Sequence, residues 1–402
     1  MSHRIIVLGA GYAGAYAAGQ LARRLHPDDV EITVVNAEPD FVERLRLHQL
    51  AAGHDLRRRE LADVFAGTGI RLRQARVTAV DAEGRTVTVT DGSTTDLLAY
   101  DTLVYALGST VADHDVPGVA EHAFHVAARP SALRLRRRLD ELDELDESAG
   151  TGSVLVVGGN LTAIEAATEI AEARPGLRVT LVTRGELGGW LGPKARRHLL
   201  RAFDRFGITV HARTTVDRVD ATHVVASDGT TFASDATVWA AGFAVHPIAA
   251  ASGLAVADNG GILVDRTMRS VSHPEVYAAG DSVHVIGDNG LPLPMSCASA
   301  GYSSKQAVAA IVAELTGREI PKTALSYVGN HISLGRKDAI FQLVDGEARS
   351  KAGALLGRSA ARVKAAILRG AAIGVNHPTF GMPTRRHRLV AAPDRPTRAV
   401  AA

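Results

Sequence analysis

Cysteine is almost absent from this chain, with Cys297 the only one among 402 residues. No intramolecular disulfide can form, and chemistry that needs a redox-active cysteine pair within the chain is excluded. An excess of one charge is also lacking, because 45 lysines and arginines face 43 aspartates and glutamates, a net charge of +2. A nucleic-acid-binding surface over the whole chain is therefore not expected.

Long apolar runs are missing as well. No uncharged apolar stretch reaches about 18 residues, so we expect no transmembrane helix. The first strand is expected from about residue 4, which leaves no room for a signal peptide. We predict a cytoplasmic protein and leave open a peripheral position at the inner face of the membrane. An apolar content of 46% over 402 residues fits an ordinary globular protein of two to three domains.

A glycine-rich turn follows the first apolar run of the chain. Gly9, Gly11 and Gly14 have the G-x-G-x-x-G spacing of a dinucleotide-binding βαβ unit. Gly9 permits the tight turn, Gly11 lets the backbone approach a pyrophosphate, and Gly14 lets the next helix pack close to the strand. An Ala-rich helical run and a second strand from Glu31 follow, so the sequence predicts a nucleotide site. A tight turn without a ligand is the alternative.

A second unit of the same kind begins about 150 residues later. The apolar run 154–157 leads into Gly158, Gly159 and Asn160, then a helical run over 164–173 and a strand over 178–182. Two such units suggest two nucleotide sites, which would bring two redox cofactors together.

Other segments complete the pattern. The run 72–90 alternates like a β-meander, and three strands end in small residues at Gly108, Gly242 and Gly280-Asp281. The charged segment 133–147 is predicted as an amphipathic helix without a chemical role. Towards the C-terminus we predict two strands within 331–344 and a tail from Pro378 that is ordered only by docking, or not at all. Residues 353–374 between them are Ala-rich and basic.

The ordered set of motifs resembles the flavoprotein reductases with two dinucleotide-binding domains. The closest branch looks like the type II NADH dehydrogenases and the quinone reductases similar to apoptosis-inducing factor. The resemblance implies an α/β fold, with two Rossmann-like domains of three-layer ββα architecture and a small C-terminal α+β region. It also implies an FAD domain built from 1–112 and 236–320, an NAD(P)H domain over 113–235, and a C-terminal region over 321–402.

The resemblance carries site residues with it. Gly280 and Asp281 match the second FAD motif, in which the Asp accepts a hydrogen bond from the ribityl chain and the next helix points at the pyrophosphate. Arg46 matches a cation near the flavin, and Val77 a position that touches the adenine. Each of these residues also has a purely structural alternative. Arg46 could be a surface arginine, Val77 an inward-facing strand residue, and Asp281 a helix N-cap. The predicted cofactor-binding set is Gly9, Gly11, Tyr12, Ala13, Gly14, Asn36, Arg46, Val77, Ala106, Gly108, Gly158, Gly159, Asn160, Arg184, Gly242, Gly280, Asp281, Cys297 and Ala298.

Three departures from the family pattern bear on the coenzymes. Asn36 stands where an acidic residue usually binds the adenosine ribose, with Glu38 close by. Asn160 replaces the middle glycine of the second turn and adds a side chain where the backbone should approach a phosphate, although Asn tolerates left-handed backbone. Poor or transient binding of nicotinamide nucleotide by this domain is the alternative. No carboxylate follows the next strand until Glu186, and Arg184 is present, which favours NADPH or a mixed preference over NADH.

Two residues are candidates for catalysis. Glu165 matches a family carboxylate near nicotinamide and flavin, and a helix N-terminal carboxylate is its structural alternative. His48 could donate a proton near the flavin, although a lone histidine is more often structural. Cys297 is expected to be a packing residue rather than a reactive thiol, and no metal site is predicted.

We therefore predict an FAD-dependent oxidoreductase that takes hydride from NADPH or NADH and passes electrons to a second acceptor. A quinone is one candidate acceptor, although family glutamines of the quinone site look replaced by Ala298 and Tyr302. A flavoenzyme that oxidises a small organic substrate directly and a redox-sensing flavoprotein are the alternatives. A homodimer is possible, and the basic C-terminal helix could touch a membrane surface; its basic residues are Lys351, Arg358, Arg362, Lys364 and Arg369.

Overall fold

The computed structural model describes residues 2–144, 152–327, 329–345, 349–381 and 385–390. Its first sheet is parallel, in the order β19-β7-β1-β2-β3. The strands are β1 (His3–Leu8), β2 (Val30–Asn36), β3 (Ile70–Gln74), β7 (Thr102–Tyr105) and β19 (Val276–Ala278). Residues on alternate sides of a strand face opposite layers. In β1, Ile5 and Val7 pack on helices, whereas Ile6 and Leu8 pack on a β-meander.

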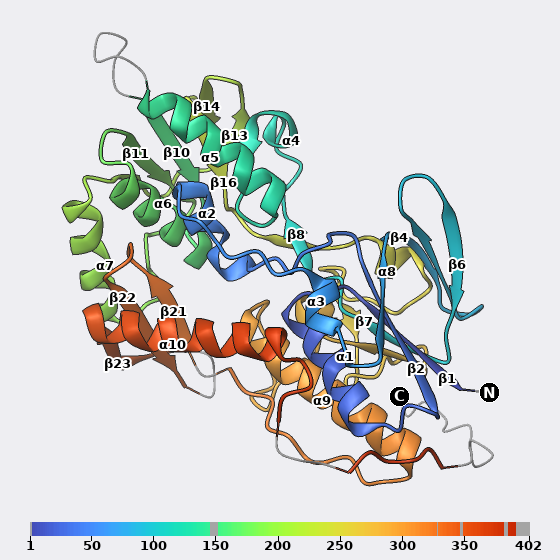
Figure 1. Cartoon of the computed structure of the whole chain (residues 1–402). Coiled ribbons are helices and arrows are strands. Elements are labelled where there is room, and N and C mark those ends of the chain that lie inside the picture. Colours follow the sequence, from blue (N-terminus) through green and yellow to red (C-terminus); the bar gives the residue numbers. More distant parts are fainter. Residues whose placement is uncertain (1, 145–151, 328, 346–348, 382–384, 391–402) are drawn as a thin grey trace.

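These two layers flank the first sheet (Figure 1). The helical layer consists of α1 (Tyr12–Arg24) and α9 (Cys297–Thr316), which pack on each other. The meander contains β4 (Arg76–Asp81), β5 (Thr86–Thr90) and β6 (Thr95–Ala99). The minor elements of this unit are η1 (Arg44–Arg46), α3 (Leu61–Phe65), α8 (Ile248–Ala251), β18 (Ile262–Leu263), η3 (Gly280–Ser282) and β20 (Val283–His284).

A second parallel sheet repeats this architecture, in the order β12-β11-β10-β16-β9. Its strands are β9 (Ala123–Phe124), β10 (Ser153–Val157), β11 (Arg178–Val182), β12 (Thr209–His211) and β16 (Ala236–Trp239). One face packs on α5 (Arg129–Asp143), α6 (Leu161–Ala173) and α7 (Pro193–Arg205). The other packs on β13 (Val216–Val219), with β14 (His223–Ala226) and β15 (Thr231–Ala233) beside it. The predicted three-layer ββα fold class is confirmed.

The chain passes between the two units twice at one place. Strands β8 (Ser109–Val111) and β17 (Phe243–Val245) form a two-stranded antiparallel ladder there. Strand β16 pairs with β10 of the second sheet, so the predicted boundary at residue 236 needs correction. Its side chains are all buried in the second unit, and the chain returns to the first only at the β17 ladder.

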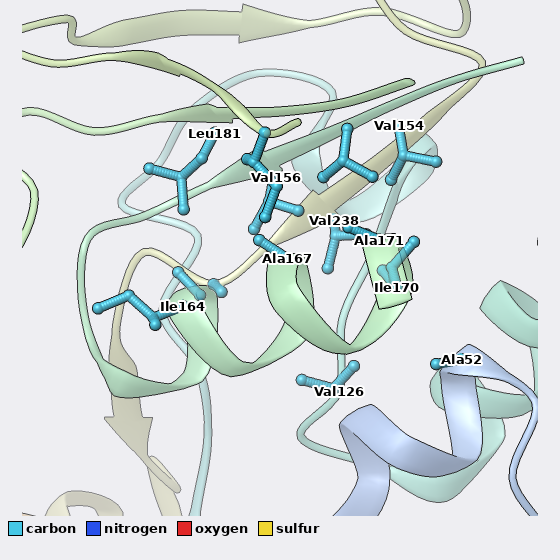
Figure 2. Packing of buried hydrophobic residues seen from close by; sticks show 14 of the residues in the cluster. Ala52, Val126, Val154, Val156, Ile164, Ala167, Ile170, Ala171, Leu181 and Val238 are labelled. Atoms are coloured by element: carbon cyan, nitrogen blue, oxygen red, sulfur yellow. The ribbon is translucent and has the colours of Figure 1, made fainter. Parts of the chain in front are cut away.

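Figure 2 shows the core under α6, where Ile164, Ala167 and Ile170 pack against strands β10, β11 and β16. Ala52 joins this core from α2 (Leu47–Ala52), although α2 comes from the N-terminal part of the chain. Helix α2 packs on both α5 and α6. The second unit therefore owes part of its core to the first 52 residues.

The C-terminal region is a three-stranded antiparallel sheet with one long helix. Its elements are β21 (Gly329–Ser333), β22 (Ala339–Val344), β23 (Ser350–Leu356) and α10 (Gly357–Asn376). The two predicted strands are present. The basic, Ala-rich segment contains the predicted helix, but its first part is a strand, because 350–356 pair with β22 and the helix begins at Gly357. Helix α10 contacts β21, β22 and β23 and reaches α1, as Figure 1 shows in orange-red. Among the described helices none is long and apolar enough to span a bilayer.

Candidate active site

A cavity of about 520 Å³ lies where the two units and the C-terminal region meet. Fourteen of the predicted cofactor-binding and catalytic residues contribute to its wall. They are Gly9, Gly11, Tyr12, Ala13, Asn36, His48, Ala106, Gly108, Asn160, Glu165, Gly280, Asp281, Cys297 and Ala298. The predicted residues that lie outside the wall are Gly14, Arg46, Val77, Gly158, Gly159, Arg184 and Gly242.

The first glycine turn has the geometry expected of it. Gly9 has a φ of +92°, and a Cβ there would lie 2.5 Å from the carbonyl oxygen of Ala106. A Cβ on Gly14 would lie 1.9 Å from the carbonyl oxygen of Gly9, so Gly14 acts through close packing. A Cβ on Gly11 would meet nothing within 4 Å, which leaves the cavity side open. Helix α1 has no side-chain cap and no acid in its first turn, so its N-terminus can face an anion.

Asn36 supports this turn from the end of β2. Its Oδ1 accepts a hydrogen bond from the Ala10 N–H at 2.8 Å, and its Nδ2 donates to the Glu38 carbonyl at 2.7 Å. The amide is thus engaged with the backbone on both sides. Glu38 also lines the cavity and brings a carboxylate to it.

Arg44 brings a positive charge to this part of the cavity wall. Its Nη1 donates to the Ser109 carbonyl at 2.6 Å and lies 3.9 Å from Asp281 Oδ2, while its guanidinium stacks over Phe243. The predicted Arg46 instead pairs with Glu43 and donates to Gln49. The 3₁₀ turn at 44–46 directs the two arginines to different sides. The sequence alone could not show which of them faces the cavity.

Asp281 stands at the other side of this network. Its Oδ2 accepts a hydrogen bond from Ser109 Oγ at 2.7 Å. The helix expected after Asp281 is α9, which begins at Cys297; a 3₁₀ turn and the short strand β20 come before it. Ser296 caps α9 by accepting from the Ser299 N–H. Burial, with a contribution from Asp281, raises the pKa of the Cys297 thiol to about 11, so the thiol stays protonated.

The second glycine turn is closely packed and capped. Cβ atoms on Gly158 and Gly159 would lie 2.4 Å from the Ala240 carbonyl oxygen and 2.3 Å from Thr183 Oγ1. Asn160 is the N-cap of α6: its Oδ1 accepts from the Ala163 N–H at 3.0 Å, and its Nδ2 donates to the Ala240 carbonyl at 2.8 Å. Its φ of −87° is ordinary, so the left-handed tolerance of Asn plays no part. The side chain occupies an N–H that a phosphate would otherwise use.

Val77 and Gly242 hold positions outside the cavity wall. Val77 is 8% exposed and packs in the core under the meander, and its predicted adenine contact stays a prediction. A Cβ on Gly242 would lie 3.2 Å from His114 Nε2 at the crossing between the units. Arg184 is exposed just after β11.

Glu165 and Lys364 form a buried ion pair in the cavity wall. The Lys364 ammonium donates to Glu165 Oε1, which also accepts from the Ser333 N–H at 2.9 Å. Burial lowers the pKa of Lys364 to about 7. His48 Nδ1 lies 3.9 Å from Glu165 Oε2, and burial lowers the pKa of His48 well below its ordinary value. Both predicted catalytic residues therefore meet at one point.

The sequence pattern places Lys364 among the exposed basic residues of a helix, and the structure corrects this placement. The residue is 5% exposed and points inward from α10, whereas Arg358, Arg362 and Arg369 are exposed. The periodicity of an Ala-rich helix gives no signal for one inward lysine, and its partner lies 199 residues away in the chain. His331, Tyr327 and other C-terminal residues also line this end of the cavity. Among the described residues no group of three or more His, Cys, Asp or Glu side chains is placed to hold a metal.

Comparison with known families identifies the family of this chain. Residues 3–310 match the family described as pyridine nucleotide-disulphide oxidoreductase. The chain belongs to this family. It is an oxidoreductase, and the resemblance to the two-domain reductases is confirmed.

Curated relatives extend over most of the chain. It is 29% identical over 357 residues to the NADH dehydrogenase-like protein Rv1812c of Mycobacterium tuberculosis, covering 84% of this chain and 87% of that one. It is 27% identical over 352 residues to the demethylphylloquinone reductase NdbB of Synechocystis, covering 84% and 86%.

Solved structures share the fold. The sulfide:quinone oxidoreductase of Aquifex aeolicus superposes with a TM-score of 0.76 at 21% identity, covering 94% of this chain and 92% of that one. NDH2 of Plasmodium falciparum, solved with NADH, superposes with a TM-score of 0.75 at 15% identity, covering 94% and 96%. At these identities the likeness concerns the fold alone.

Proposed function

We propose that the protein is an FAD-dependent NAD(P)H oxidoreductase that passes electrons to a quinone. One observation carries the proposal: a single cavity joins the first glycine turn, at the N-terminus of α1, to the N-terminus of α6 with Glu165. A hydride donor and its acceptor have to share one enclosed space. The names of the curated relatives, NADH dehydrogenase-like protein and demethylphylloquinone reductase, support both substrates.

The residues around the first glycine turn fit FAD. Gly11 leaves the approach to α1 open for a pyrophosphate, and Glu38 offers a carboxylate for ribose hydroxyls. Asp281 can accept a hydrogen bond from a hydroxylated chain. Arg44 keeps Nη2 buried without a hydrogen-bond partner among the described residues, which fits a ligand acceptor on its cavity side.

FAD bound there would supply hydride acceptance from the nicotinamide and electron transfer to the acceptor. The chain contributes orientation, charge and exclusion of water. Arg44 places a fixed positive charge on the wall of the cavity, where negative charge is stabilised without reorganisation. The Glu165–Lys364 pair can hold a proton at the wall, because burial brings the pKa of Lys364 to about 7.

The coenzyme preference is proposed as NADPH or mixed. Glu186, the first carboxylate after β11, pairs with Arg196 at 2.9 Å and with Arg213 at 2.6 Å. A carboxylate neutralised by two arginines repels a 2′-phosphate less than a free one. Arg184 is exposed two residues before Glu186 in the chain, and we expect it to attract the phosphate.

The test is anaerobic stopped-flow of the FAD-loaded protein. NADH and NADPH are mixed with it in separate experiments, and the visible absorbance of the flavin is followed. Fast bleaching by either, followed by recovery on adding a soluble quinone, supports the proposal. Bleaching without recovery would refute the quinone as acceptor. No bleaching by either coenzyme would refute the NAD(P)H half-reaction itself.

A second function has one observation in its favour. Because Asn160 caps α6, the second nucleotide site offers one phosphate-binding N–H fewer than its glycine-rich counterpart. A flavoenzyme that oxidises a small organic substrate directly needs no nicotinamide there. In that case NAD(P)H would not bleach the protein, whereas a substrate oxidised at the cavity would.

The peripheral membrane position and the homodimer stay predictions. The exposed arginines of α10 stand beside exposed apolar residues, Val363 and Ile373, on the same helix. Co-sedimentation with anionic vesicles tests the first, and sedimentation velocity tests the second.

A further inference from the structure

Acidic and histidine side chains run from the cavity to the surface between α2 and α6. Glu165 and Glu169 lie one helical turn apart on α6, so they share the face that packs on α2. His48 belongs to α2, and His54 follows shortly after its end. The side chains of His48 and Glu169 are 4% and 1% exposed, whereas that of His54 is 38% exposed.

Two pairs of groups in this row lie close together. Glu165 Oε2 lies 3.9 Å from His48 Nδ1, and Glu169 Oε1 lies 3.0 Å from His54 Nε2. His48 Nε2 and both oxygens of Glu169 are buried without a well-aligned hydrogen bond among the described residues. Buried polar atoms in this state cost stability, so a fold that keeps several of them together calls for a reason.

The surrounding charges set the protonation of the row. Burial raises the pKa of Glu169 to about 7, with Glu172 of α6 acting in the same direction and Arg336 and Arg46 opposing it. Arg336 Nε lies 3.8 Å from Glu169 Oε1, from the turn between β21 and β22.

The two histidines are pushed towards the neutral form. Burial lowers the pKa of His48, and Lys364 of α10 is the largest charge acting in the same direction, before Arg336, Arg46 and His54. Burial lowers the pKa of His54 as well; Arg336, Arg46 and Arg136 of α5 act with it, and Glu172 opposes. Neutral imidazoles can take a proton on one nitrogen and release it from the other.

We propose that His54, Glu169 and His48 conduct a proton from solvent to Glu165 at the cavity wall. The inference rests on the proposed function, in which NAD(P)H, a proton and a quinone give NAD(P)⁺ and a hydroquinone. The hydride brings two electrons and one proton, so one further proton has to enter from solvent in each turnover. Where two groups of the row stand beyond hydrogen-bond distance, one bridging water completes the step.

The decisive variant is Glu169→Gln, which keeps the shape of the side chain and cannot carry a proton. Glu172→Gln is the matched control, because Glu172 lies on the same helix and binds the same turn by accepting from the Arg336 N–H. Both variants remove a carboxylate beside Arg336. Only Glu169→Gln also interrupts the proposed proton path.

The FAD-loaded protein is measured in two ways. Infrared difference spectroscopy against pH should show a carboxyl C=O band that titrates near neutral pH, absent in Glu169→Gln and present in Glu172→Gln. In stopped-flow with a pH indicator, proton uptake and quinone reduction should slow about tenfold or more in Glu169→Gln, with an enlarged solvent isotope effect. Bleaching by NAD(P)H should stay within about twofold, since the hydride step takes no proton from this row.

Wild-type proton uptake and isotope effect in Glu169→Gln would overturn the proposal, and so would equal slowing in Glu172→Gln. Should Glu169→Gln fail to fold, His54→Ala gives a second test, because the ring is partly exposed. Its turnover should fall and recover with added imidazole, and a fall without recovery would count against the path. A wild-type protein that reduces no quinone would refute the proposed function instead, and the infrared band would then report on Glu169 alone.

Discussion

The Glu165–Lys364 pair makes a quantitative prediction about stability and pH. Lys364 has an ordinary pKa of 10.5 and a folded-state pKa of about 7, lowered by burial. A shift of about 3.5 units corresponds to about 5 kcal/mol, because one unit is worth about 1.36 kcal/mol. Burying the charged lysine therefore lowers the free energy of unfolding by roughly this amount.

The sign follows from proton linkage. Below pH 7 both states hold the proton, and the penalty is present in full. Between pH 7 and 10.5 the unfolded chain binds more protons than the folded one, so this group makes the protein more stable as pH rises. Above pH 10.5 both states are neutral and the penalty is gone.

The double variant Glu165→Gln/Lys364→Met isolates this effect, since it removes both charges and leaves neither partner buried alone. Urea unfolding of the wild type and the double variant, followed from pH 6.5 to about 10.5, gives the difference in unfolding free energy. Relative to the variant, the wild type should gain about 1 kcal/mol per pH unit. A difference that stays flat across this range would refute the buried, shifted lysine. Lys364→Met alone is expected to cost about 3–5 kcal/mol, because it orphans a buried carboxylate.

Three further predictions concern the nucleotide sites. Gly14→Ala should lose bound FAD and destabilise the first unit, since its Cβ would lie 1.9 Å from a backbone oxygen. Gly11→Ala should fold normally and only weaken FAD binding. Equal stability of the two variants in thermal unfolding would contradict this. Asn160→Gly should cost only a few tenths of a kcal/mol and lower the KM for NAD(P)H in steady-state kinetics, and a raised KM would show that the amide helps binding. Arg184→Glu should reduce kcat/KM for NADPH relative to NADH about tenfold, and an unchanged ratio would remove Arg184 from coenzyme choice.

Local patterns in the sequence predicted the fold well. The glycine spacings and apolar runs define both βαβ units, because strand, turn and helix there are close in the chain. The steric roles of Gly9 and Gly14 follow from the same local geometry. The domain boundary failed at β16, since which sheet a buried strand joins depends on pairing across about 80 residues rather than on its own composition.

The parts of the site that the sequence missed depend on long-range packing. Lys364 reads as one more cation on a basic helix until α10 docks on the C-terminal sheet and turns it towards Glu165. Arg44 and Arg46 are equivalent by composition, and only the 3₁₀ turn decides which one faces the cavity. Asn160 was identified as a departure, but its role as a helix cap required the bonds to Ala163 and Ala240.

The cavity wall is formed partly by residues inside the family match and partly by residues beyond it. For this reason family membership does not identify the electron acceptor. The family match ends at residue 310, and within it lie the glycine turns, Arg44, Asp281 and Glu165. The rest of the wall comes from beyond the match, through Tyr327, Asn330, His331, Lys364 and Leu368. The wall residues predicted to bind the nucleotides thus belong to the shared part, whereas those that close the far end of the cavity do not. We expect acceptor specificity to depend on the C-terminal sheet and α10 together with Ala298, a wall residue within the match, because relatives of one fold are free to differ at such positions.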